Sequence, residues 1–363
     1  MKKTTLLSTT IALIGFTTTA SATNAHIYAN TTTAYNAAIL QHTIAQVAFS
    51  SFTPTKTNPI NHLNTNTNTK NPTATYGHAP MYGTAPIYGE YNDDGLAGRS
   101  GGDAINARRH TLNNLWFDWQ HANINTNLDS TARLGTKYNL FMAGLAGGET
   151  RFKYGHATWG IYSGFLDAQH HNHDITTKSQ GGLFGVYNKY ATKNFNLAAT
   201  VNGGVIDNTS DTIFGTDEHT NFWISGTLNT TYDIALDSTF TLQPGIQTGY
   251  TWIKAENYTS ASGDILTNDA FDIFEVTPTI RAIKHIGNGW YGTLDAKYVM
   301  FFTNGGDITA NGIKYNTPSD IHFSEYGLSL EKSVGYITLR ANIARRDGAH
   351  DGWIGGLNFK YLF

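Results

Sequence analysis

The sequence predicts an all-β fold, a transmembrane antiparallel β-barrel of about twelve strands. Three observations lead to this fold class. Apolar and polar residues alternate over runs of about 10–14 residues, which is long enough for a tilted strand to cross a bilayer. Charged residues make up only 14% of the chain, whereas an ordinary globular domain has about 25%. An export signal precedes the alternating runs.

The N-terminus predicts a secretory signal peptide over residues 1–22. Lysines follow Met1, residues 6–16 are mildly apolar, and Ala20 and Ala22 form an A-x-A cleavage site, so cleavage is expected after Ala22. No later stretch has about 20 consecutive apolar residues, so a membrane crossing has to use strands. The chain has no cysteine, which excludes disulfides, thiolate metal sites and cysteine nucleophiles.

Residues 23–102 predict a low-complexity, disordered segment that serves as a short passenger or a linker. Residues 62–75 are polar and repetitive, with too little apolar area to offset the entropy of ordering the backbone. Residues 76–89 repeat the pattern Tyr-Gly-x-Ala-Pro, which favours a semi-extended spacer. Upstream of both, apolar residues near one face predict a helix over residues 35–47. A second, polar helix is predicted over residues 103–113, with Asp103 as its N-cap.

From residue 115 onward the sequence predicts strands. One parity of the run at residues 240–253 carries Phe240, Leu242, Ile246, Tyr250 and Trp252, and the other is mostly Gln, Gly and Thr, which puts one face in hydrocarbon and the other in water. Strands are expected near residues 115–124, 132–145, 153–169, 181–191, 195–205, 222–233, 240–253, 274–281, 293–302, 321–332, 337–343 and 353–363. Strands in hydrocarbon must pair all their backbone groups, so the sheet is expected to close.

Tryptophans near the strand ends predict aromatic girdles at the two membrane interfaces. The candidates are Trp223, Trp252, Trp290 and Trp353. The structural alternative is a soluble β-sandwich whose alternating faces form a two-layer core. Strand length and the signal peptide favour the membrane barrel over the sandwich.

Several stretches of the chain resemble the C-terminal translocator domain of type V autotransporters, including the barrels of vacuolating-cytotoxin-like proteins. These stretches are NLW at 114–116, LGTKYNLFMAG at 134–144, GIYSG at 160–164, LQPGIQTGY at 242–250 and GLNFKYLF at 356–363. The resemblance covers about residues 103–363 and implies a twelve-stranded outer-membrane barrel with a short N-terminal helix in the lumen. Residues 103–113 match that helix by position, and residues 23–102 are much shorter than the family's usual passengers.

Charges that share the polar parity of their strands are expected to line the lumen. They are Lys137, Glu275, Arg281, Asp295, Lys297, Glu325, Glu331, Arg340 and Lys360. Their mixed signs predict a lumen held by charge pairs, and not a strongly ion-selective pore. Arg108 and Arg109 on the predicted lumen helix are complementary to Glu275, Glu325 or Glu331, which suggests that they pair there.

The last strand predicts a recognition signal for the barrel-assembly machinery. Leu357, Phe359, Tyr361 and Phe363 share one parity and are expected to face lipid, while Asn358 and Lys360 face the lumen. Such a strand is similar to the ends of other outer-membrane proteins, which the assembly machinery reads by strand augmentation. The alternative is an ordinary last strand.

No motif of a known catalytic chemistry is present, so the chain is not expected to be an enzyme. The cluster His170, His171, His173 and Asp174 lacks metal-ligand spacing and is expected to lie in a solvated hairpin loop, so neither a metal nor another cofactor is predicted. A net charge of −3 provides no basic face for a nucleic acid.

These observations predict a barrel in the outer membrane of a Gram-negative bacterium that translocates or displays its N-terminal segment at the cell surface. The expected partners are outer-membrane lipid, the export translocon, periplasmic chaperones and the assembly machinery, with the barrel itself monomeric. Two other functions stay open at this point. They are a small-solute porin whose N-terminal segment is periplasmic, and a secreted soluble adhesin.

Overall fold

The computed structural model describes residues 42–44, 114–127, 133–147, 150–172, 175–212, 214–315 and 320–363. The predicted signal peptide, most of residues 23–102 and the predicted helix at 103–113 with Arg108 and Arg109 lie outside these residues. A short helical segment, His42–Ile44, falls within the helix expected at 35–47. In the described part of the chain, no helix is long and apolar enough to span a membrane.

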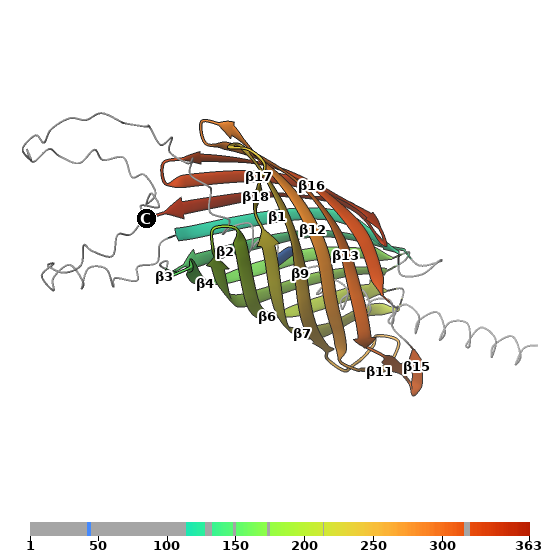
Figure 1. Cartoon of the computed structure of the whole chain (residues 1–363). Coiled ribbons are helices and arrows are strands. Elements are labelled where there is room, and N and C mark those ends of the chain that lie inside the picture. The colour runs from blue at the N-terminus through green and yellow to red at the C-terminus, as the bar shows by residue number, and fades with distance from the viewer. Residues whose placement is uncertain are drawn as a thin grey trace, which may run out of the picture. The chain divides into compact units, whose positions relative to one another are not determined.

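Twelve long strands form one closed antiparallel sheet in the described part of the chain, as the sequence predicts (Figure 1). They are β1 Asn114–Asn127, β2 Arg133–Ala146, β4 Gly155–Asn172, β5 Ile175–Ala191, β6 Phe195–Thr212, β7 Gly215–Tyr232, β9 Phe240–Ala255, β12 Phe271–Gly287, β13 Trp290–Gly305, β16 Ile321–Val334, β17 Ile337–Gly348 and β18 His350–Leu362. Each pairs with its neighbours in the chain, β9 pairs with β12, and β1 pairs with β18 to close the barrel.

The two ends of the barrel differ in their connections. We call one the short-turn end, where β1 begins and β18 ends, and where the strands β3 (Thr150–Phe152) and β8 (Ile234–Ala235) lie. At its hairpin between β12 and β13, Asn288 and Gly289 both have positive φ, 50° and 75°, so this Asn-Gly pair makes the tight turn that matches the twist of the two strands. We call the opposite end the long-loop end.

Two long loops at the long-loop end form a second, four-stranded sheet (Figure 1). The β9–β12 loop contributes β10 (Tyr258–Thr259) and β11 (Ile265–Asn268), and the β13–β16 loop contributes β14 (Ile308–Ala310) and β15 (Ile313–Tyr315). β11 pairs with β14 across the two loops. Leu266, Ile308 and Ala310 form a separate small apolar cluster in this sheet.

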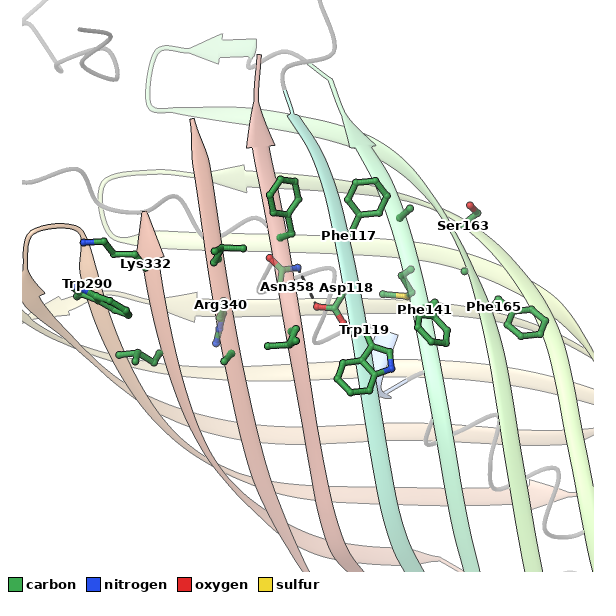
Figure 2. Close-up of a pocket in the computed structure, with 18 residues that line it drawn as sticks. Phe117, Asp118, Trp119, Phe141, Ser163, Phe165, Trp290, Lys332, Arg340 and Asn358 are labelled. Carbon is green, nitrogen blue, oxygen red and sulfur yellow. Dashed lines mark hydrogen bonds between the residues drawn. The ribbon is translucent and has the colours of Figure 1, made fainter. Parts of the chain in front are cut away.

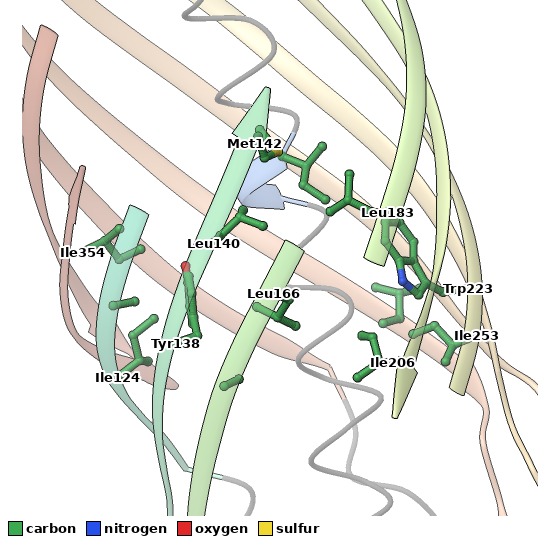
Figure 3. Close-up of a cluster of buried hydrophobic side chains, with 14 of the residues drawn as sticks. Ile124, Tyr138, Leu140, Met142, Leu166, Leu183, Ile206, Trp223, Ile253 and Ile354 are labelled. Carbon is green, nitrogen blue, oxygen red and sulfur yellow. The ribbon is translucent and has the colours of Figure 1, made fainter. Parts of the chain in front are cut away.

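The buried apolar side chains of the barrel form a cluster on its inward face (Figure 3). In a solvent-filled pore this face would be lined by polar side chains. Near the short-turn end, large rings lie against glycines of the neighbouring strand. A Cβ at Gly144 would lie 2.4 Å from the Trp116 ring, and one at Gly160 would lie 2.1 Å from the Tyr187 ring. Because these positions lack a Cβ, the rings can lie along the wall.

The outward face is a broad apolar belt. It includes Phe117, Phe141, Phe165, Phe184, Phe222, Ile224, Leu228, Tyr250, Phe274, Leu294, Leu328, Leu339 and Leu357, all at least a third exposed. On β7 the belt runs from Phe222 to Tyr232, which at about 3.4 Å per residue is about 34 Å along the strand. A strand tilt of about 35–45° reduces this to about 25 Å, the height of a lipid-facing band.

Three details of the sequence analysis are wrong. Trp223 is 3% exposed and points into the core, so it cannot belong to an interfacial girdle (Figure 3). Lys137 is exposed and shares the parity of Phe141, so it lies on the outward face, beyond the belt and toward the long-loop end. His170 and His171 belong to β4 and not to a loop, because β4 pairs with β5 as far as Asn172.

Candidate functional site

The lumen contains a buried ion-pair cluster near the long-loop end. The register sets Lys297 of β13, Glu325 of β16 and Arg346 of β17 side by side on the inward face. The Glu325 carboxylate accepts hydrogen bonds from Lys297 Nζ at 2.6 Å and Arg346 Nε at 2.8 Å, and Lys297 Nζ lies 3.3 Å from Asp295. Glu325 is 2% exposed, and buried charges of this kind are stable only when paired.

A second polar row crosses the barrel closer to the short-turn end. The register aligns Glu331, Arg340, Asn358 and Asp118 on β16, β17, β18 and β1. Arg340 donates to Ser329 Oγ at 2.9 Å, and Asn358 Nδ2 donates to Asp118 Oδ2 at 3.1 Å. The row crosses the junction of first and last strands, so its contacts also tie that junction together.

The remaining predicted lumen charges lie on the same inward face. Arg281 of β12 is opposite Asp295 of β13 and donates to Gln243 at 3.4 Å, and Lys360 is opposite Thr338. Apart from Lys137, the eight predicted lumen charges therefore lie on one wall of the lumen, from β12 through β13, β16 and β17 to β18. The sequence pattern gives their parity, but only the register shows which of them meet.

The opposite wall of the lumen, formed by β5, β6, β7 and β9, is mostly uncharged. Short hydroxyl and amide side chains there bond across neighbouring strands, in the pairs Thr177–Ser210, Ser179–Asn208, Thr200–Thr227, Ser225–Thr251 and Asn229–Gln247, at 2.6–3.2 Å. None of the inward side chains of β6 is charged. These pairs are neutral, and Lys189 of β5 and Asp217 of β7 are the buried Lys, Arg, Asp or Glu side chains on the described strands of this wall, so the wall presents few fixed charges to a chain in the lumen.

The segment His42–Ile44 lies inside the lumen between the two walls. His42 Nδ1 is 2.5 Å from Glu275 Oε1, and Thr43 Oγ1 is 3.2 Å from the Tyr138 hydroxyl. Ile44 is fully buried in the core cluster. Sequence analysis predicts a helix here but gives no sign of these contacts, because the residues involved are far apart in the chain.

The β9–β12 loop, which carries two strands of the four-stranded sheet, contacts the inward side of β7 at the long-loop end. Its Tyr258 ring stacks on His219 of β7 with centroids 5.0 Å apart, and the backbone N–H of Ala261 donates to Asp217 Oδ1 at 2.6 Å. Asp217 and His219 are buried and share the inward parity of β7. The loop between β9 and β12 is thus held to the inner side of a strand that is not its neighbour in the chain.

The junction of β1 and β18 is continuous, with pairing from Asn114–Leu362 to Thr126–His350. Leu357, Tyr361 and Phe363 are exposed on the outward side, and the Phe359 and Phe117 rings lie 6.2 Å apart across the junction. An apolar groove of about 1040 Å³ runs over this outward surface, and Phe117, Phe141, Phe165, Leu339 and Leu357 are among its lining residues (Figure 2). The groove is part of the apolar belt.

Among the described residues, no group of three or more His, Asp and Glu side chains could hold a metal ion. His170 instead bonds to Thr136 at 3.1 Å and His171 to Thr176 at 3.1 Å. His173 and Asp174 lie outside the described residues.

A comparison with known protein families identifies the family of this barrel. The model of the autotransporter beta-domain matches residues 115–350. The chain belongs to this family. The autotransporter barrel lies in the outer membrane of a Gram-negative bacterium, so its short-turn end faces the periplasm and its long-loop end faces the cell surface. A porin and a soluble adhesin are not favoured.

Solved structures of autotransporter translocators share the fold. The transport unit of AIDA-I from Escherichia coli has 13% identity and a TM-score of 0.57, over 70% of this chain and 92% of that one. The beta domain of the Bordetella autotransporter BrkA has 14% identity and a TM-score of 0.55, over 70% and 100%. The translocator domain of NalP from Neisseria meningitidis has 11% identity and a TM-score of 0.58, over 72% and 92%. The comparison with curated protein sequences finds no match.

Proposed function

We propose that this autotransporter barrel translocates its own N-terminal segment, residues 23–102, and displays at the cell surface the part of it that lies outside the lumen. The observation that supports this most is the burial of His42–Ile44 inside the lumen. These residues precede β1 by about 70 positions, so a segment well upstream of the barrel occupies the conduit.

The composition of the upstream segment fits the conduit. Lys56 and Lys70 are the only Lys, Arg, Asp or Glu residues between positions 23 and 89. A segment with so few charges can pass the mostly uncharged wall of β5–β9 without the desolvation cost that charged side chains carry. On the charged wall opposite, Glu325, Lys297, Arg346 and Asp295 are paired with one another, which limits the attraction of these four groups for the passing chain.

Protease treatment of intact cells tests the proposal. Residues 76–91, with their Tyr-Gly-x-Ala-Pro repeat, are the target, and an antibody against the barrel reports the length of the remaining chain. We expect the protease to shorten the protein on intact cells while a periplasmic marker protein stays whole. Cleavage that begins only after the outer membrane is opened contradicts export and favours a periplasmic N-terminal segment.

Delivery to the membrane is the second part of the proposal. Residues 1–22 direct the chain to the export translocon, periplasmic chaperones keep it unfolded, and the assembly machinery reads Leu357, Phe359, Tyr361 and Phe363. We expect Phe363→Ser to lower the amount of heat-modifiable barrel in the outer membrane, and Phe274→Ser, the same change elsewhere in the belt, to do so much less. Equal losses for the two variants count against a terminal signal.

Occlusion after export is the third part. Residues 103–113 return through the periplasmic part of the lumen, where Arg108 or Arg109 pairs with a carboxylate. Glu331 is the most suitable of the three candidates because it forms no ion pair among the described residues, whereas Glu325 and Glu275 each have a partner. We expect Arg109→Glu to raise the conductance of the reconstituted protein, and unchanged conductance contradicts this pairing.

The β-domain is a transport fold and not an enzymatic one. We infer that the whole protein acts without catalysis and without a cofactor. The function then depends on assembly of the barrel in the membrane, passage of the N-terminal segment through the lumen, and closure of the lumen afterwards. A cell-surface activity of the displayed segment is the outcome that would change this view.

A further inference from the structure

A recess in the lumen near the cell-surface end is built around one buried carboxylate, that of Glu275 on β12. Gln247 Nε2 donates to Glu275 Oε1 at 2.8 Å, and the Thr277 hydroxyl donates to it at 2.7 Å. The other carboxylate oxygen, Oε2, is buried without a hydrogen-bond partner. Two rings, Phe301 of β13 and Phe323 of β16, form the apolar side of the recess.

The charge of this carboxylate is not balanced by the barrel strands. Glu275 is 3% exposed, and among the described strands no lysine or arginine forms an ion pair with it. Lys297 and Arg346 are nearby, but both are bound to Glu325. A buried carboxylate that has only neutral donors is costly, so the recess is suited to receive a cation.

His42 occupies the recess. Its Nδ1 lies 2.5 Å from Glu275 Oε1, and its Nε2 lies 4.0 Å from Glu325 Oε2. The imidazole meets Phe301 and Phe323 edge to face, with centroids 6.3 Å and 6.2 Å away. The ring thus has carboxylates at both nitrogens and aromatic rings on its sides, and it is fully buried.

The next two residues extend the contact to the far side of the lumen. Thr43 bonds to Tyr138 of β2, and Ile44 packs in the main core cluster. The segment therefore touches β12 and β16, which have only β13 between them, and also β2, which is separated from β16 by β17, β18 and β1. A segment held at several strands can block the lumen more firmly than one bound to a single wall.

We propose that the Glu275 recess is a docking site for a histidine side chain, and that His42 in this site holds the N-terminal segment as a plug in the cell-surface half of the lumen. The plug is separate from any closure by residues 103–113. The proposal goes beyond export, because it concerns where the exported chain comes to rest.

A thiol reporter in the lumen tests the plug directly. The chain has no cysteine, so Ala122→Cys, at a fully buried inward position of β1, provides a single reactive group. The full-length protein in lipid vesicles is treated with a small charged thiosulfonate. We expect His42→Ala to raise the labelling rate roughly tenfold or more, and His62→Ala, the same change elsewhere in the upstream segment, to leave it unchanged.

Added imidazole tests the chemistry of the recess. Free imidazole should slow labelling of the His42→Ala protein, because it can fill the recess next to Glu275, and it should have no effect once Glu275→Gln is added. Glu275→Gln alone should speed labelling as His42→Ala does, and the double variant should label no faster than either single one. Heat-modifiable migration on gels verifies that each variant is folded.

Three results would overturn the proposal: equal labelling of the His42→Ala and unaltered proteins, equal acceleration by His62→Ala, or no effect of imidazole on the His42→Ala protein. Labelling in vesicles does not depend on export in cells. If labelling contradicts the plug but protease still cuts residues 76–91 on intact cells, the plug is wrong and export stands. If labelling supports the plug but protease cuts only after the outer membrane is opened, export is wrong and the plug stands.

Discussion

Replacing Glu325 by Gln tests whether the lumen ion pairs stabilise the barrel. Glu325 is the shared acceptor of Lys297 and Arg346, at 2.6 Å and 2.8 Å, and all three are buried. Removing one charge of a buried pair costs about 3–5 kcal/mol. Gln can still accept a hydrogen bond, and Lys297 retains Asp295 at 3.3 Å, so the low end, about 3 kcal/mol, is expected. This corresponds to roughly a hundredfold change in the unfolding equilibrium constant.

The free energy of unfolding can be measured by urea titration of the protein in lipid vesicles, with tryptophan fluorescence as the signal. Glu218→Gln is the matched control, because Glu218 lies on the exposed side of β7 beyond the belt and forms no ion pair among the described residues. We expect the control to stay within about 0.5 kcal/mol of the unaltered protein. If the two variants have the same stability, the ion pairs do not hold the barrel, and the reasoning from burial is refuted.

Two further predictions concern a close packing contact and a periplasmic turn. Gly160→Ala should destabilise the barrel by about 1–3 kcal/mol because the new Cβ would clash with the Tyr187 ring. Gly182→Ala is the control and should leave the stability unchanged, because no atom lies within 4 Å of its Cβ. Equal effects of the two variants in urea titrations would contradict this prediction. Hydrogen bonds from Thr239 hold the pKa of Asp237 below its usual value. The charged form of Asp237 therefore stabilises the fold at neutral pH. The difference in unfolding free energy between the unaltered protein and Asp237→Ala should shrink as pH falls below about 4, where the carboxylate becomes protonated. A difference that stays constant with pH would show that the hydrogen bonds to the carboxylate contribute nothing.

The strands could be predicted because their signal is local. Each long strand alternates apolar and polar residues, and the ends of the expected runs fall inside or close to the observed strands. The inward side of Glu275, Glu325 and Arg340 follows from the same alternation. Their partners do not, because register joins residues that are far apart in the chain, such as Glu325 and Arg346.

Other features depend on contacts that no local pattern records. The small sheet at the cell-surface end uses strands of two to four residues, too short for a periodic signal. Trp223 lies near an apolar run, yet it packs inward over Gly204, where an added Cβ would lie 2.9 Å from its ring nitrogen. The position of His42 depends on Glu275, which is more than 200 residues away in the chain.

The contacts between the β9–β12 loop and β7 bear on how freely this loop can move. Tyr258 stacks on His219, and the backbone N–H of Ala261 donates to Asp217, both on the inward side of β7. The loop is therefore attached at three strands, β9, β12 and β7, and not only at the two strands that it connects. We expect the width available to a chain at the cell-surface end to depend on these two side chains of β7 as well as on the number of strands in the barrel.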